Sequence, residues 1–379
     1  MKFICKKDTI FIIGLCWWGL FSLIEFTYNV NSFLINIKYL GLVLIIFAGV
    51  LNARNIKISP IKLIIYISIV LFFLINNVFL AKDKSFAEIL IILVCSIGYS
   101  YNYDYILQNY ACIRLLTLIT IIGLALIGRL PNNQTIGLRL RYYLGFGWVS
   151  FAPFIFLFIV LSFIWINHNK FYVWQALFFL VINQFLYVKT DTKTAYGLTI
   201  IAVVMWFLVT KLEKNIKISR LGAILISVLP IFLMVLILYL SFNSYKFNDI
   251  NNLLSNRLDL GKQGINIFGI KLFGQPYFDV TTGLLHQLNG YYFTVDSALL
   301  RYLLHFGIIS TVIMLALYQQ LIWNLLKRKL YVRSVVIIII FISAFSDPWF
   351  LNLSFNIFWI TLNFLFIDFD FRNLGMRRN

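Results

Sequence analysis

Apolar runs long enough to cross a bilayer recur along this chain, and they constrain its fold more than any other feature. A helical run of about 20 residues spans the roughly 30 Å of hydrocarbon in a membrane. Such runs begin near residues 9, 37, 62, 86, 113, 148, 171, 195, 221, 298, 334 and 351. The chain is 61% hydrophobic and only 12% charged. We therefore predict an all-α polytopic membrane protein with about twelve transmembrane helices.

The distribution of basic residues predicts the orientation of these helices. If the N-terminus is cytoplasmic, most of the 32 lysines and arginines fall on inner segments. The positive-inside rule then places both termini in the cytoplasm. The first apolar run has the basic flank of a signal peptide but no small-residue cleavage site, so we expect a retained helix. Because the inner loops are short, chemistry is expected at the outer face or within the membrane.

The chain is expected to form one integral membrane domain, residues 1–379, with two notable loops on the outer side. The medium loop covers 129–147 and the long loop 242–296. Within the long loop, the segment "INIFGIKLFG" carries apolar residues with little charge. This pattern predicts a segment that lies on the bilayer surface or caps the bundle. A loop of this length with its own apolar anchors is usually functional.

Metal and disulfide chemistry are not expected. The four cysteines, Cys5, Cys16, Cys95 and Cys112, form no CxxC pair. The three histidines are not spaced as metal ligands. We therefore predict no disulfide framework, no metal site and no cofactor.

The medium loop contains three arginines, Arg129, Arg139 and Arg141, and no acidic residue. A guanidinium group keeps its charge and binds two phosphate oxygens at once, so the pattern predicts a specific anion site. Arg141 is the stronger candidate because it adjoins the aromatic and glycine run "YYLGFG". The alternative is contact with lipid headgroups at the membrane interface.

In the long loop, "SNRLDLG" places Arg257 two residues before Asp259. One interpretation makes Arg257 a second clamp on a phosphate, with Asp259 holding its orientation. The other is an exposed ion pair that contributes less than about 1 kcal/mol. Farther along, Asp347 and Pro348 in "FSDPWF" predict a tight outer turn.

The stretch "TVDSALLRYLLHFGII" carries ionisable residues into the start of an apolar run. Asp296 and Ser297 are both good N-cap residues for the helix that begins there. Arg301 and His305 follow four residues apart, on one helical face about one turn into the membrane. A buried arginine is costly unless it faces a partner or a polar cavity, so this face is predicted to point into a site. The alternative is an internal ion pair between Asp296 and Arg301.

Three further outer-loop residues are candidates for contact with a sugar. His286 is a candidate base toward a sugar hydroxyl near neutral pH, although a lone loop histidine is more often simply solvated. Tyr291 and Tyr292 offer flat faces on which sugar rings stack. Aromatic belts at membrane interfaces produce the same enrichment.

Four stretches together resemble the Wzy-type polysaccharide polymerases, which are relatives of the O-antigen ligases. They are "YYLGFGWVSFAPF", "TDTKTAYGLTII", "LLSNRLDLGKQGINIFGIKLFGQ" and "VDSALLRYLLHFGII", in the family's order, and they span about residues 140 to 320. Lys193 stands where the family usually has arginine, and Ser297 where it usually has asparagine. The first change keeps a charge but loses the fork of donors.

The resemblance implies a GT-C-like helical bundle in the bacterial cytoplasmic membrane. Its substrates would be an undecaprenyl-pyrophosphate-linked glycan donor and a lipid-linked acceptor, joined at the outer face. Arg141 and Arg257, helped by Arg139 and Arg301, would neutralise the departing pyrophosphate. Asp296 or His286 would accept the proton of the attacking hydroxyl, and Tyr291 and Tyr292 would contact sugar.

Two other functions are compatible with the sequence. A ligase would transfer finished polymer to a different acceptor, and a flippase would move lipid-linked oligosaccharide across the membrane. Transporters usually carry paired discontinuous helices or charges near the middle of the membrane. Here the distinctive charges lie at the predicted outer edge, which favours the polymerase. A chain-length regulator and a flippase are possible partners, and no nucleic acid is expected.

Overall fold

A computed structural model gives the structure of the chain. It describes residues 6–27, 32–53, 56, 58–135, 140–212, 218–279 and 293–367. The fold is mostly helical, which confirms the predicted class at this level. Of the predicted site residues, Arg139, His286, Tyr291 and Tyr292 lie outside the described residues.

The helices of the first half of the chain begin within about five residues of the predicted apolar runs, except α5, which begins ten residues before the run predicted near 113. They are α1 (Lys6–Ile24), α2 (Ser32–Asn52), α3 (Pro60–Phe73) with a π-helical extension (Leu74–Leu80), α4 (Lys84–Ser96), α5 (Tyr103–Leu126), α6 (Phe151–Ile166), α7 (Val173–Thr190) and α8 (Lys193–Leu212). A 3₁₀ turn, Ile97–Asn102, joins α4 to α5. The predicted run near residue 86 therefore forms a helix of 13 residues, short for a membrane span.

The second half contains two helices of the long loop as well as apolar helices. They are α9 (Arg220–Ser227), α10 (Leu229–Phe242), α11 (Asn248–Leu253), α12 (Arg257–Phe268), α14 (Ala298–Lys327) and α15 (Tyr331–Ser346). A 3₁₀ turn, Ser244–Lys246, precedes α11. Beyond α15 the chain forms 3₁₀ segments, Pro348–Leu351 and Ile357–Leu365, at the last predicted span.

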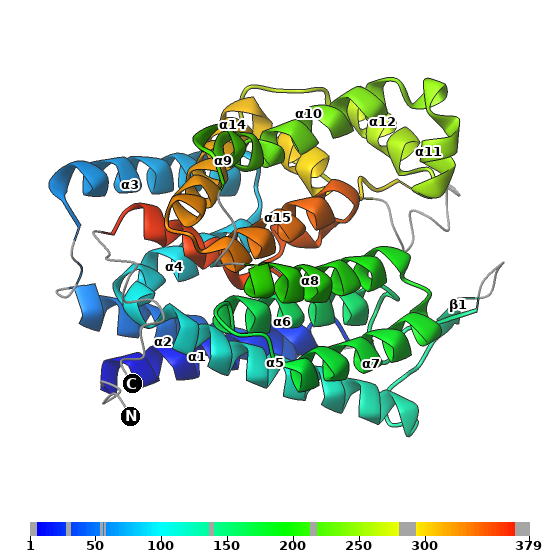
Figure 1. Ribbon diagram of the computed structural model, residues 1–379, viewed down its shortest axis with the longest axis horizontal. Helices are drawn as coiled ribbons and strands as arrows, with labels where there is room; N and C mark the ends of the chain where they lie inside the picture. Colours follow the sequence, from blue (N-terminus) through cyan, green and yellow to red (C-terminus); the bar gives the residue numbers. More distant parts are fainter. Residues whose placement is uncertain are drawn as a thin grey trace.

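The helices form a bundle whose members run roughly along its longest axis (Figure 1). α8 packs against α15, which in turn packs against α14, while α6 packs against α5, α7 and α8. We call the end that carries α12, the α7–α8 turn and the start of α14 the α12 end. Most side chains of α6 and α14 are buried, whereas most side chains of α3 are exposed.

Four helices in the described part of the chain are long and apolar enough to cross a membrane. They are Pro60–Leu80, Tyr103–Leu126, Lys193–Leu212 and Ala298–Lys327. α9 and α10, bent by 43° relative to each other, make a fifth if they are one span. These helices indicate a membrane protein, while the twelve spans and the outer position of the long loop stay predictions.

α14 is interrupted at Gly307, where the backbone has φ 80° and ψ 174°. The long-loop segment that follows α12 lies against this break. Gln275 N donates to the His305 carbonyl, and Ile308 N donates to the Lys271 carbonyl. The loop therefore satisfies backbone groups that the break leaves without helical partners.

The predicted surface or cap segment "INIFGIKLFG" is divided between two environments. Ile265 is a buried residue of α12, while Leu272 is 60% exposed beside the break in α14. The medium loop contains a two-residue antiparallel pair, β1 (Gln134–Thr135) with β2 (Arg141–Tyr142). This pair sets Arg141 next to the C-terminal end of α7.

Candidate functional site

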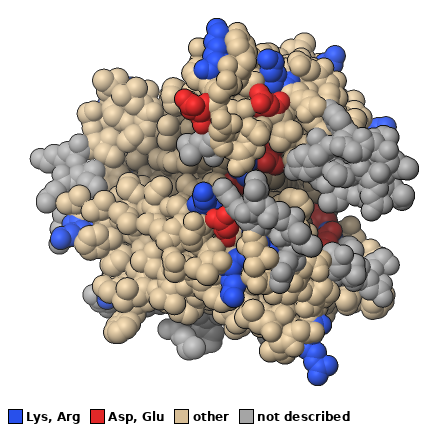
Figure 2. Space-filling model, turned by 90° about the vertical axis from the view of Figure 1, so that its right-hand side faces the viewer, with Lys and Arg blue, Asp and Glu red and all other residues tan. Residues whose placement is uncertain are grey.

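Charged side chains gather at the α12 end, which faces the viewer in Figure 2. Acidic and basic groups lie next to one another in the middle of this face, and most of the surface around them is formed by other residue types. Two linked groups of residues make up this charged region: a cluster around Arg257 and a cavity lined by Arg301.

Arg257 joins three elements in the cluster. It begins α12, directly after Ser255 and Asn256, which both have left-handed backbone conformations. Its Nε lies 3.0 Å from Asp296 Oδ2, and its Nη2 lies 3.3 Å from Asp347 Oδ1. Its Nη1 also donates a hydrogen bond to the Ser346 carbonyl. Most donors of this guanidinium are therefore already bound by the protein.

Asp259 has a different partner from the one that the sequence predicted. Its Oδ2 accepts a hydrogen bond of 2.6 Å from Asn251 Nδ2, while Asp296 and Asp347 are the carboxylates that hold Arg257. The tight turn predicted at Asp347 and Pro348 is present as a 3₁₀ turn. Its aspartate is also a partner of Arg257, which the turn interpretation did not foresee.

The two carboxylates of the cluster bind protons more strongly than exposed aspartates do. Burial raises the pKa of Asp347 to about 6, and Arg257 opposes this shift. Burial likewise raises the pKa of Asp296, again with Arg257 opposing. Asp296 precedes the helix, and Ser297 is the actual N-cap of α14, since its Oγ accepts from Leu300 N.

Arg301 pairs with a long-loop residue. Its Nη2 lies 2.7 Å from Asp279 Oδ2, and its guanidinium carbon lies 5.0 Å from the centre of the Tyr277 ring. The Tyr277 hydroxyl donates to Asp279 Oδ1 at 2.9 Å. The alternative prediction of an ion pair between Asp296 and Arg301 is therefore replaced by Arg257–Asp296 and Arg301–Asp279 pairs. Arg301 and His305 line the same cavity, and the prediction that this cavity is a functional site stays a prediction.

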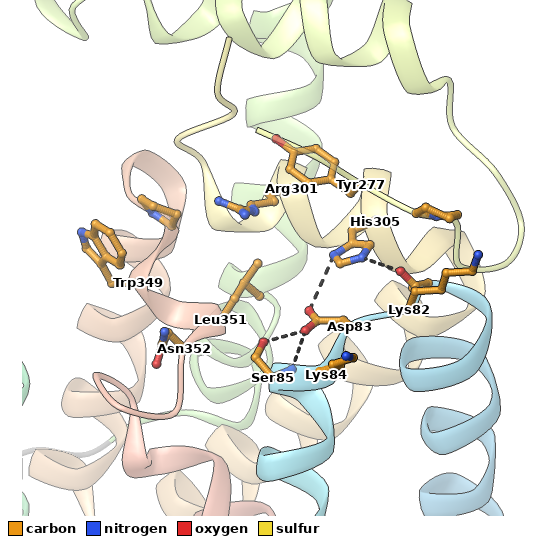
Figure 3. A pocket seen from close by; sticks show the side chains of 13 residues that line it. Lys82, Asp83, Lys84, Ser85, Tyr277, Arg301, His305, Trp349, Leu351 and Asn352 are labelled. Carbon is orange, nitrogen blue, oxygen red and sulfur yellow. Dashed lines mark hydrogen bonds and ion pairs between the residues drawn. The ribbon is translucent and has the colours of Figure 1, made fainter. Parts of the chain in front are cut away.

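That cavity has a volume of about 520 Å³ and joins four segments of the chain (Figure 3). It is lined by Ala81, Lys82, Asp83, Lys84, Ser85, Pro276, Tyr277, Arg301, His305, Pro348, Trp349, Leu351 and Asn352. Three basic side chains, an aspartate and a histidine therefore share one space with two aromatic rings. Such a lining offers donors to an anion and acceptors to hydroxyl groups.

His305 and Asp83 face each other in this cavity (Figure 3). His305 Nδ1 lies 3.7 Å from Asp83 Oδ2, and its Nε2 lies 3.1 Å from the Ala81 carbonyl oxygen. Asp83 is also the N-cap of α4, because Oδ1 accepts from Ser85 N and Phe86 N. The helix breaks at Gly307, two residues after His305, and the long-loop segment after α12 bonds to the backbone at this break.

Arg141 belongs to a different set of contacts. Its Nη2 donates to the Asp191 carbonyl at 2.8 Å, in the turn between α7 and α8. Its Nε is buried and has no hydrogen-bond partner among the described residues. Arg141 is absent from the cavity lining. The structure brings Arg257 together with Asp296, whereas Arg141 contacts the turn between α7 and α8.

Asp83, Asp279 and Lys82 are site residues that the sequence alone did not single out. A usable signal was present only for the "AKDK" run, where Lys82, Asp83 and Lys84 interrupt two apolar stretches. Asp279 lies in a loop without a regular pattern. In the described part of the chain, no group of three or more His, Cys, Asp or Glu residues is arranged to hold a metal ion.

The site has cations for a phosphorylated ligand, acceptors for hydroxyl protons and an aromatic wall, all at one end of a helical bundle. Comparisons of the chain with protein-family models, curated proteins and solved structures give no match.

Proposed function

We propose that this protein polymerises lipid-linked oligosaccharide repeat units into surface polysaccharide at the outer face of the bacterial cytoplasmic membrane. It would transfer a glycan from undecaprenyl pyrophosphate to a hydroxyl of a second lipid-linked unit. The single observation that carries the proposal is the cavity that combines Arg301, Lys82 and Lys84 with Asp83 and His305. Glycosyl transfer from a pyrophosphate requires both kinds of group, cations for the leaving group and an acceptor for the proton.

A small apolar pocket of about 10 Å³ lies beside the cavity, next to the exposed helix α3. Between α3, α4, α14 and the last 3₁₀ segment it is lined by residues that include Tyr66, Phe73, Phe86, Leu90, Leu317 and Trp359. Phe86 lines this pocket and its neighbour Ser85 lines the cavity. A prenyl chain that packed along the exposed side chains of α3 beside this pocket would therefore reach the polar site while staying in contact with the bilayer.

The proposed reaction is a direct displacement at the anomeric carbon. The bond between that carbon and the pyrophosphate oxygen breaks as the acceptor oxygen bonds to the carbon. Arg301 and the two lysines would stabilise the charge that gathers on the departing oxygens. Arg257 would hold Asp296 and Asp347 in place, and Arg141 and Arg139 would contribute from the medium loop.

The proposed orientation places the α12 end outside the cell and both termini in the cytoplasm. In this orientation, Lys170 and Arg220 lie at the opposite, inner end of the bundle, as the positive-inside rule favours. With the cavity outside, the lipid-linked units would be joined after they had crossed the membrane.

The proposal is tested with purified protein in nanodiscs, supplied with an undecaprenyl-pyrophosphate-linked repeat unit. We expect glycans of increasing length and release of undecaprenyl pyrophosphate. Arg301→Ala should slow the transfer by about 100-fold, since a preorganised cation that stabilises developing charge contributes about that much. Arg220→Ala, an exposed arginine at the start of α9, is the matched control. Absence of transfer by the unmodified protein, or full activity of Arg301→Ala, would contradict the proposal.

A ligase would use the same chemistry with another acceptor, and a deletion strain separates the two. Single repeat units accumulate if a polymerase is lost, whereas lipid-linked long polymer accumulates if a ligase is lost.

A flippase is the second candidate because of one observation, the break of α14 at Gly307. Discontinuous helices are common where transporters bind substrate. The same nanodisc assay decides, since a flippase makes no new glycosidic bond.

A further inference from the structure

A backbone carbonyl fixes which ring nitrogen of His305 carries a hydrogen. Its Nε2 lies 3.1 Å from the Ala81 oxygen, within hydrogen-bond distance. A carbonyl oxygen only accepts hydrogen bonds, so Nε2 carries the hydrogen. In the neutral ring the other nitrogen, Nδ1, is then a bare acceptor. This nitrogen is the one that faces Asp83 in the cavity.

The two carboxylate oxygens of Asp83 have different surroundings, one bound at the start of α4 and the other facing the cavity. Oδ1 accepts hydrogen bonds from Ser85 N at 2.8 Å, from Ser85 Oγ at 2.6 Å and from Phe86 N at 3.2 Å. Oδ2 faces His305 Nδ1 at 3.7 Å, which is too long for a direct hydrogen bond. Within the described residues, Oδ2 receives no hydrogen bond. The cavity therefore presents two acceptors side by side without a donor between them.

Two acceptors at this spacing match two neighbouring hydroxyl groups on one sugar ring. Each hydroxyl donates one hydrogen, the first to Nδ1 and the second to the carboxylate. Trp349 provides aromatic surface in the same cavity, and such surfaces pack against the apolar faces of sugar rings. Arg301 lies beside Tyr277 in the cavity, so an anion bound to Arg301 would be next to the sugar (Figure 3).

We propose that His305 Nδ1 and Asp83 Oδ2 form a paired acceptor for two neighbouring hydroxyls of the acceptor sugar, and that Nδ1 is the catalytic base. This inference rests on the proposed function and identifies its acceptor subsite. Asp296, the base expected from the sequence, does not line the cavity, and its Oδ2 is bound by Arg257.

The chemical step is balanced within the two substrates and the imidazole. The O–H bond of the attacking hydroxyl breaks, and its proton moves to His305 Nδ1. The oxygen forms a bond to the anomeric carbon of the donor sugar. The bond from that carbon to the pyrophosphate oxygen breaks, and its electron pair leaves with the pyrophosphate. The imidazolium ion formed is stabilised by Asp83 and by the Ala81 carbonyl.

The first test measures the form of the ring directly, by ¹⁵N solid-state NMR of histidine-labelled protein in lipid nanodiscs at neutral pH. The chain has three histidines, so His305→Gln assigns the signal by its loss. We expect a neutral ring with hydrogen on Nε2 and a bare Nδ1. A ring protonated on Nδ1, whether neutral or charged, overturns the inference. This result does not depend on whether the protein transfers a glycan.

The second test separates the base from its partner by kinetics with the lipid-linked repeat unit. His305→Gln keeps an amide donor for the Ala81 carbonyl and loses the basic nitrogen, so kcat should fall by at least about 100-fold with little change in KM. Asp83→Asn keeps the helix cap and loses one acceptor, so KM should rise on the order of tenfold.

His168→Gln is the control, because His168 is buried just beyond the C-terminal end of α6 and does not line the cavity. Unchanged kcat in His305→Gln, or an equal loss in His168→Gln, overturns the role of the base. If Asp296→Asn alone abolishes turnover while His305→Gln does not, Asp296 is the base instead. If the unmodified protein makes no glycosidic bond, the proposed function fails, and the NMR result still decides the acceptor pair.

Discussion

Arg257 is the residue on which the charged cluster at the α12 end depends. Its two carboxylate partners come from different parts of the chain, one before α14 and one after α15. Asp347 is only 4% exposed, so its charge requires a fixed partner. Loss of the guanidinium would leave two carboxylates close together without a cation.

We expect Arg257→Ala to lower the free energy of unfolding by about 2 kcal/mol, since buried charges without partners are costly. The thermal midpoint of the purified protein in detergent reports this change. Adding Asp347→Asn to the variant should restore part of the loss, because it removes one of the unpaired charges. A midpoint of Arg257→Ala equal to that of the unmodified protein would show that the cluster contributes nothing to stability.

The cluster also makes stability depend on pH. Burial raises the pKa of Asp347 from 3.8 to about 6, so the folded protein binds this proton more tightly than the unfolded chain does. The contribution of Asp347 to stability is therefore complete below about pH 4 and is lost as the pH rises through 6. Relative to the unmodified protein, Asp347→Asn should gain stability over this interval. A constant difference in thermal midpoint between pH 4 and 7 would contradict the shift.

At this scale the sequence identified individual residues better than their pairings. Arg257, Asp296 and Arg301 were predicted as site residues, and all three lie in the charged region. Their partners were not predicted, because Asp347 is 90 residues from Arg257 and Asp279 lies in an irregular loop. Two buried arginines, Arg114 and Arg333, likewise contact residues more than 150 positions away.

At the scale of elements, the break in α14 links the long loop to the cavity. Gly307 has a positive φ, and an added Cβ would lie 2.6 Å from the Phe273 backbone. Gly274, on the loop side, is equally close to the Asn76 carbonyl. Asn76 also donates to the Phe306 carbonyl, so a π-helical turn, a loop and a broken helix meet at one point. This junction fixes the position of His305.

Gly307→Ala should therefore destabilise the protein by about 2 kcal/mol or more, through backbone strain and overlap with Phe273. Gly197→Ala in α8 is the matched control, because nothing lies within 4 Å of its added Cβ. That change should be neutral or stabilise by up to about 1 kcal/mol, since alanine favours a helix. Thermal midpoints measured side by side give the comparison, and equal midpoints for the two variants would mean that the break carries no constraint.

Composition predicted where most helices begin, because apolar runs bounded by charges carry that information, but α5 starts ten residues early and the last predicted run forms 3₁₀ segments. The break at Gly307 was not predicted, since a glycine within an apolar run is equally compatible with a continuous helix. What distinguishes the two cases is a loop more than 30 residues earlier that supplies backbone partners, and no local pattern encodes that contact.

For the whole molecule, the distribution of basic residues predicts which end of the bundle faces the outside of the cell. Tyr245 is an exposed residue at the α12 end, and Asn169 is an exposed residue after α6, at the opposite end. Single cysteines at these positions, in a background with the four natural cysteines replaced, report the side of the membrane.

A maleimide that cannot cross membranes should label Tyr245→Cys in intact cells. Asn169→Cys should react only after the cells are permeabilised. The reverse pattern would place the cavity in the cytoplasm and exclude a reaction on exported lipid-linked units.

The central claim is that the cavity at Arg301 holds the phosphate groups of a lipid-linked glycan. A cryo-EM map of the protein in nanodiscs with an undecaprenyl-pyrophosphate-linked repeat unit tests it most directly. We expect density for the diphosphate within hydrogen-bond distance of Arg301, the first sugar near His305 and Asp83, and the prenyl chain along α3. Diphosphate density at any other place on the molecule, with this cavity empty, would contradict the account.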